Sequence, residues 1–86
     1  MYQISLTRTA SKEIKKLNNP LRSRILKAIE QLKPDPFPPG CKKLTGSDDF
    51  WRIRVGDYRI IYYVERDRMI ITITRVAHRK DVYGNL

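Results

Sequence analysis

The chain has 86 residues, which suits one domain, over residues 1–86, with a single modest hydrophobic core. Hydrophobic residues make up 41% of the chain, a share typical of globular proteins rather than disordered ones. Lysine and arginine number 18 against 9 acidic residues. The resulting net charge of +9 favours a polyanionic partner, nucleic acid first of all, or an acidic protein.

The sequence also argues against two further classes of protein: membrane proteins, and proteins that rely on a disulfide or a metal ion. No apolar stretch approaches transmembrane length and no signal-peptide core follows Met1, so we expect a soluble cytoplasmic protein without a membrane partner. Cysteine and histidine each occur once, as Cys41 and His78, which leaves no internal disulfide and no convincing metal site. Any nuclease chemistry in this chain is therefore expected to need neither metal nor cofactor.

The first third of the chain predicts a strand and then two helices. Apolar residues alternate with polar ones from Tyr2 to Leu6, as in a strand with one buried face. Helical stripes follow at Ala10, Ile14 and Leu17, and then at Leu21, Ile25, Ala28, Ile29 and Leu32. Between them, Asn19 is a predicted N-cap with Pro20 in the first helical position. So short a connection predicts an antiparallel helix hairpin.

The rest of the chain predicts a sheet. Residues 34–40 contain four prolines and a glycine, and predict a crossing loop that Phe37 anchors to the core. Strands are then predicted over Phe50–Val55, Tyr58–Val64 and Met69 to about Ala77. Their short connections indicate a three-stranded antiparallel meander with the helices packed on one face. The predicted fold class is α+β.

The pleat of these strands gathers basic side chains on the face away from the helices. A two-residue loop at Gly56–Asp57 places Arg54 opposite Arg59, with Arg52 on the same side. A second two-residue turn at 66–67 would place Thr74 beside Arg59. Facing like charges cost stability, and an anionic ligand would offset that cost. The alternative is that the long arginine side chains splay into water.

The segment at the end of the last predicted strand, residues 75–83, concentrates groups that bind phosphate or move protons. It holds the only histidine, His78, together with Arg79, Lys80 and Tyr83. If the alternation of the strand persists, His78 points to the basic face. The alternative is a solvated tail with a surface histidine.

Taken in order, these segments resemble a RelE-type toxin of a bacterial or archaeal toxin–antitoxin pair. The resemblance rests on the strand–helix–helix start and on four motifs: residues 43–46 (KLTG), 51–54 (WRIR), 56–62 (GDYRIIY) and 78–83 (HRKDVY). It implies a ribosome-dependent endoribonuclease that cuts mRNA in the decoding site. It also implies neutralisation by a cognate, acidic, RelB-like antitoxin.

The resemblance also implies roles for individual residues. Arg59 corresponds to the arginine at the scissile phosphate, Arg79 to the arginine near the end of the last strand and Tyr83 to the C-terminal tyrosine. Arg52 and Arg54 stand where the best-known member has lysines, and arginine cannot serve as a base at neutral pH. We therefore expect these two to bind RNA, together with Lys43 and Lys80.

Metal-free RNA cleavage uses the substrate 2′-OH as nucleophile, and it needs a base, an acid and cations around the phosphorane. Arg59 is the predicted phosphate stabiliser, assisted by Arg79. The proton carrier stays open between His78, whose side-chain type titrates near neutrality, and Tyr83. Two other functions compete: a ParE-like toxin that binds DNA gyrase without cutting RNA, and a non-toxic RNA-binding protein.

Overall fold

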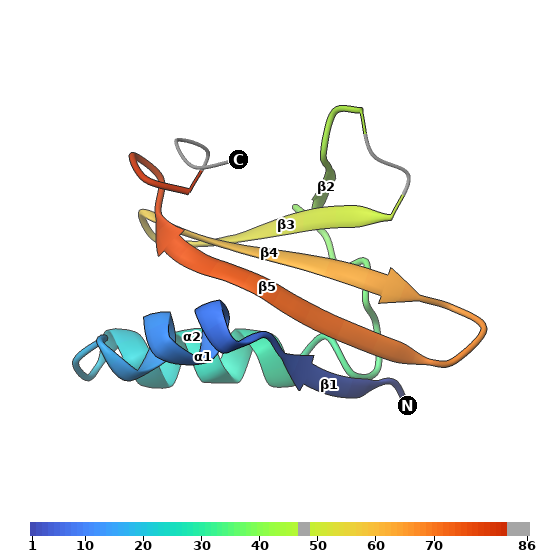
Figure 1. Ribbon diagram of the computed structural model, residues 1–86, viewed down its shortest axis with the longest axis horizontal. Helices are drawn as coiled ribbons and strands as arrows, with labels where there is room; N and C mark the ends of the chain where they lie inside the picture. The colour runs from blue at the N-terminus through green and yellow to red at the C-terminus, as the bar shows by residue number, and fades with distance from the viewer. Residues whose placement is uncertain (47–48, 83–86) are drawn as a thin grey trace.

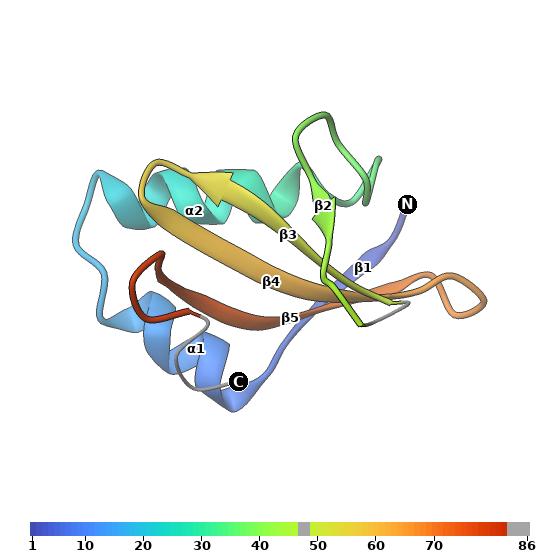
Figure 2. The same cartoon turned by 90° about the horizontal axis from the view of Figure 1, so that it is seen from above.

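A mixed five-stranded sheet carries two helices on one face (Figures 1 and 2). The structure is a computed structural model that describes residues 1–46 and 49–82. Its elements are β1 (Gln3–Leu6), α1 (Arg8–Lys15), α2 (Leu21–Glu30), β2 (Lys42–Lys43), β3 (Phe50–Val55), β4 (Tyr58–Glu65) and β5 (Ile70–His78). The strand order is β1-β5-β4-β3-β2. Strand β1 runs parallel to β5, and every other pairing is antiparallel.

The predicted α+β class, the N-terminal strand, the helix pair and the meander of β3, β4 and β5 are confirmed, but the sheet also includes β1 and the unpredicted strand β2. Strand β1 pairs in parallel with β5, far away in the chain, so no local turn signal could reveal the pairing. Strand β2 has only two residues, too few for a period-two pattern. The prediction of a three-stranded sheet was therefore incomplete.

Both helices use the apolar stripes seen in the sequence. Thr7 caps α1, because its hydroxyl accepts a hydrogen bond of 3.1 Å from the Ala10 N–H. Helix α2 begins at Leu21 with no side-chain cap, so the predicted Asn19 cap was wrong. The Asn19 side chain instead accepts a bond from the Ser23 hydroxyl. None of the described helices is long and apolar enough to cross a membrane.

The main core lies between the helices and the sheet. It contains Ile25 and Ile29 of α2, Leu32 just after this helix, and Ile60, Tyr62, Ile71 and Ile73 from the sheet, all buried as predicted. Full burial of such a side chain contributes about 1.5–3 kcal/mol. The Tyr62 hydroxyl donates a 2.7 Å bond to the Pro36 carbonyl, and burial raises the pKa of this tyrosine well above its usual range. The bond therefore ties the proline-rich loop to the sheet.

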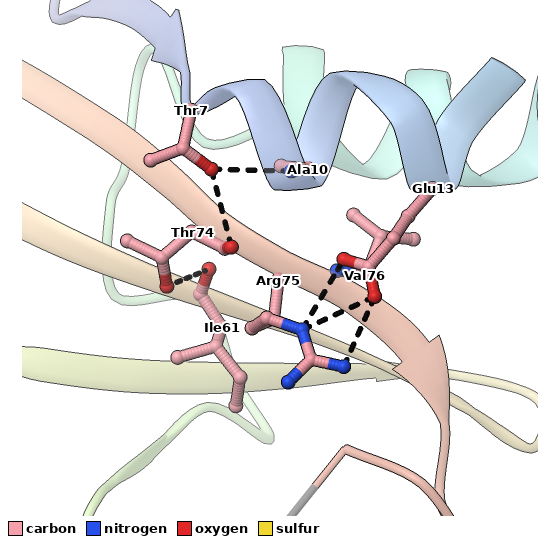
Figure 3. Close-up of polar contacts among 7 residues, drawn as sticks. All are labelled: Thr7, Ala10, Glu13, Ile61, Thr74, Arg75 and Val76. Carbon is pink, nitrogen blue, oxygen red and sulfur yellow. Dashed lines mark hydrogen bonds and ion pairs between the residues drawn. The ribbon is translucent and has the colours of Figure 1, made fainter. Parts of the chain in front are cut away.

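The register between β4 and β5 differs from the prediction in two ways. Glu65 pairs with Ile70, so four residues rather than two form the turn. A β-bulge then shifts the register between Ile61 and Tyr62. At the bulge the Thr74 hydroxyl donates to the Ile61 carbonyl at 3.2 Å (Figure 3). Arg59 consequently faces Ala77, and the prediction that Thr74 lies beside it was wrong.

Helix α1 covers the edge of β5 beyond the end of β1. One Glu13 carboxylate oxygen accepts the Val76 N–H at 2.7 Å, and the other pairs with the Arg75 guanidinium at 3.0 Å (Figure 3). The Glu13 and Arg75 side chains are only 20% and 17% exposed. One carboxylate thus satisfies an edge N–H that no strand covers, and it holds α1 against the sheet.

Candidate functional site

The sheet face away from the helices, called the outer face below, carries cations in two like-charged pairs. Arg54 lies directly opposite Arg59 on the neighbouring strand, as predicted. Lys42 lies directly opposite Arg52. Side chains of directly opposed residues are close enough that like charges destabilise the sheet. Four cations in this arrangement therefore favour an anion on the outer face.

Arg52 is a second reason to expect an anion on the outer face. Its side chain is buried, with 7% of the residue exposed, and Nη1 has no hydrogen-bond partner within residues 1–46 and 49–82. The outer face also bears a small apolar cluster of Ile61, Ala77 and Val82. A buried charge is costly unless it is paired and hydrogen-bonded.

Three arginines lie at the turn between β3 and β4. Arg59 Nη1 donates to the Gly56 and Tyr58 carbonyls at 3.2 and 3.0 Å. The Arg79 N–H donates to the Asp57 carbonyl at 2.8 Å, while its guanidinium makes a long, exposed ion pair with the Asp57 carboxylate at 3.9 Å. Arg24 of α2 reaches the same turn, since its Nη2 would lie 3.7 Å from a Cβ added at Gly56. We call Arg24, Arg59 and Arg79 the turn arginines.

Gly56 allows the tight turn between β3 and β4. Its φ of 58° is the left-handed conformation that glycine tolerates best, and it suits the first position of a two-residue hairpin loop. The loop pairs Val55 with Tyr58, as predicted. The turn thus fixes the Arg54–Arg59 pairing and also presents the carbonyls that orient Arg59.

His78 does not point to the outer face, so that prediction was wrong. Because of the bulge it pairs with Tyr58, whose ring packs against the main core on the helix side. The two rings are 5.6 Å apart, edge to face. His78 Nδ1 accepts the Lys80 N–H at 3.1 Å, which shapes the turn after β5. Tyr83, the other predicted proton carrier, lies outside the described residues.

The remaining residues that were predicted to contact RNA lie on different surfaces of the protein. Lys80 is exposed just beyond β5. Lys43 lies opposite Trp51, on the helix-side alternation, whereas Lys42 shares the outer face with Arg52. Sequence reasoning therefore missed Lys42, because only the register of the two-residue strand β2 reveals its neighbour. It did not single out Arg24, because the spacing along α2 carries no sign of the turn nearby.

The opposite end of β4 has a different electrostatic character. Tyr63 lies on the outer face near three acids, and the Asp49 carboxylate is the main cause that raises the pKa of its hydroxyl. A tyrosine with a raised pKa is a poor base at neutral pH. In the part of the chain that the structure describes, no three His, Cys, Asp or Glu side chains gather to hold a metal ion.

Comparison with known proteins identifies the family. A sequence model for the ParE toxin of the type II toxin–antitoxin system parDE matches residues 4–83. Toxin RelE3 of Methanocaldococcus jannaschii is 33% identical over 85 residues, covering 94% of this chain and 94% of the relative. The chain belongs to the RelE/ParE toxin family. The resemblance found in the sequence is thereby confirmed.

Solved RelE structures agree with this membership. RelE in the archaeal RelE–RelB complex of Pyrococcus horikoshii matches with 29% identity and a TM-score of 0.80, covering 91% of this chain and 94% of that chain. The isolated RelE toxin of Escherichia coli matches over 100% of both chains with a TM-score of 0.81. At 22% identity the second match shows the shared RelE fold.

Proposed function

We propose that this RelE/ParE family member is an mRNA endonuclease that cuts RNA held on the ribosome. The observation that carries the proposal is the Arg54–Arg59 pair, two directly opposed arginines at a turn where Arg79 is also anchored. Such a pair is unfavourable by itself and favourable around a phosphate. The outer face offers few groups for reading base edges, so positioning of the mRNA by the ribosome supplies what the toxin lacks.

The proposed reaction is an internal displacement. The RNA 2′-OH loses its proton and attacks the adjacent phosphorus, the bond to the 5′-oxygen breaks, and that oxygen takes up a proton. The products are a 2′,3′-cyclic phosphate and a free 5′-OH. Arg59 binds the phosphorane oxygens with its planar guanidinium, and Arg79 adds positive charge from the next turn.

We propose Tyr83 as the proton carrier, because the position of His78 does not suit that role. His78 lies on the helix side of the sheet, and its Nδ1 is occupied by the Lys80 N–H. We assign His78 a positioning role, since that bond orders the turn that begins with Arg79.

The proposed partner is an acidic antitoxin. The net charge of +9 favours an acidic protein, and the P. horikoshii relative was solved in complex with RelB. An antitoxin that places carboxylates on the outer face would occupy the position of the RNA phosphates. Binding of this antitoxin and binding of mRNA are therefore expected to exclude each other.

A translation reaction with purified ribosomes and a defined mRNA tests the function, with cut sites mapped by primer extension. A supercoiling assay with DNA gyrase tests the competing function, because the family model that matches this chain describes ParE toxins. Cuts that require both ribosome and toxin support the proposal. Gyrase inhibition without cuts would replace it with the ParE-like function.

A further inference from the structure

Asp57 places a carboxylate among the turn arginines. It is the second residue of the Gly56–Asp57 loop, two positions before Arg59. Arg24 reaches the same loop from α2, and the Arg79 guanidinium pairs with the Asp57 carboxylate at 3.9 Å. An acidic side chain therefore lies beside Arg79, one of the two cations that the proposed function assigns to the phosphorane.

Asp57 also ties the turn after β5 to the turn between β3 and β4. The N–H groups of residues 80–82 all bond to His78, one to Nδ1 and two to the carbonyl, so these bonds stay within the turn after β5. The Arg79 N–H instead donates to the Asp57 carbonyl at 2.8 Å. Asp57 thus contacts Arg79 at two points, the main chain through its carbonyl and the guanidinium through its carboxylate.

The turn between β3 and β4 does not itself require a carboxylate. Gly56 has a positive φ and Asp57 does not, the pattern of a type II′ hairpin turn. Asparagine suits the second position of such a turn as well as aspartate does. The carbonyl contact with Arg79 is likewise independent of the side chain. What asparagine would lack here is the negative charge beside the guanidinium.

The ion pair leaves one edge of the guanidinium for another anion. The carboxylate oxygen approaches Arg79 from the Nε side, and both side chains are mostly exposed. The two Nη groups can still bind two oxygens of a phosphate. The pair with Asp57 can therefore orient Arg79 without occupying the edge that a phosphate would use.

We propose that Asp57 is a positioning residue for the cleavage reaction, which orients the Arg79 guanidinium through Nε and leaves its Nη groups to the RNA phosphate. This role rests on the proposed function. A guanidinium held in one orientation meets the phosphorane more often in the productive geometry, so the carboxylate raises kcat. The same negative charge repels the RNA phosphate and therefore raises KM.

Cleavage of a defined mRNA on purified ribosomes tests this role with three variants. Asp57→Asn keeps the size and the turn preference but removes the charge, and it should lower kcat about three- to tenfold and KM about two- to fivefold. Asp57→Glu restores the charge and should return kcat toward the wild-type value. Asp67→Asn makes the same charge change on the exposed turn between β4 and β5, and it should leave both constants nearly unchanged.

Three results would overturn the proposal. A lower kcat with a higher KM in Asp57→Asn would indicate a distorted turn. An unchanged kcat in that variant would leave the carboxylate no orienting role, and equal effects of Asp57→Asn and Asp67→Asn would show a general charge effect.

The ¹⁵N relaxation of the Arg79 Nε–H group in the isolated protein separates this proposal from the function. Faster motion in Asp57→Asn but not in Asp67→Asn, in a protein that never cuts mRNA, would keep Asp57 as the group that orients Arg79 and remove the function. Unchanged motion and unchanged kinetics in Asp57→Asn, in a protein that does cut mRNA, would remove this role of Asp57 and leave the function.

Discussion

The two faces of the sheet differ in how their polar and charged side chains are paired. On the helix side, the Tyr62 hydroxyl has the Pro36 carbonyl, and at the β5 edge that α1 covers, the Glu13 carboxylate has both Arg75 and the Val76 N–H. On the outer face, like charges oppose each other at two positions and Arg52 is buried with an unpartnered nitrogen. The polar groups of the helix side stabilise the fold, whereas the like charges of the outer face would be stabilised by a bound anion.

Substitution of the proposed proton carrier is expected to have the largest effect, and this effect is on the rate of mRNA cleavage rather than on stability. Tyr83→Phe should lower the rate of mRNA cleavage about 10²–10⁴-fold, because the base is lost. His78→Asn should lower it less than about tenfold, since His78 only shapes the turn. Single-turnover cleavage on ribosomes over a range of pH measures both. A pH profile that loses its acidic limb in His78→Asn instead would assign the role of base to the histidine.

Arg59→Ala should slow cleavage about 10²–10³-fold, the usual cost of removing one stabiliser of a developing oxyanion. Its free energy of unfolding should stay near that of the wild type, because the change also relieves the pair with Arg54. Arg68→Ala is the matched control at the other end of β4, where the arginine makes an exposed pair with Glu65. Equal loss of cleavage in both variants would show a general charge effect.

Glu13→Ala is expected to be the costliest change in stability. It leaves the mostly buried Arg75 guanidinium and the Val76 N–H without their acceptor, at a cost of about 2–3 kcal/mol. Glu30→Ala breaks an exposed pair with Lys33 and should cost less than about 0.5 kcal/mol. Urea unfolding of the two variants makes the comparison, and similar midpoints would contradict this role of Glu13.

Two adjacent tyrosines on β4 lie on opposite faces of the sheet, so their substitution compares the two faces directly. Tyr62→Phe removes the buried bond to Pro36 and should lower the free energy of unfolding by about 1–2 kcal/mol. Tyr63→Phe, on the outer face, should change it by less than about 0.5 kcal/mol. Thermal unfolding followed by circular dichroism measures both. A larger loss in Tyr63→Phe would reverse the assignment of the faces.

The smallest expected effect is an increase, rather than a decrease, in the free energy of unfolding. Lys42→Gln removes one charge of the pair with Arg52 and should raise the free energy of unfolding by about 0.2–1 kcal/mol. Lys15→Gln, on the exposed surface of α1, provides the baseline for loss of one positive charge. If the two variants unfold alike, the Lys42–Arg52 pair carries no special repulsion.

Local patterns in the sequence predicted the helices and the β3–β4 register. The apolar stripes set the faces of α1 and α2, and the Gly56–Asp57 loop alone fixed Arg54 opposite Arg59. The placement of His78 failed because the alternation was carried across a bulge, which Thr74 stabilises by a hydrogen bond that leaves no period in the sequence. Lys42 was missed for a similar reason, since its partner depends on where the chain leaves the loop at Gly40.

The ends of the cut RNA provide the most direct test of the central claim, that outer-face arginines stabilise attack by the substrate 2′-OH. The measurement is mass spectrometry of the fragments released from ribosome-bound mRNA. We predict a 2′,3′-cyclic phosphate on the upstream fragment and a 5′-OH on the downstream one, with both lost in Arg59→Ala. A 3′-OH with a 5′-phosphate, or intact cleavage in that variant, would contradict the account.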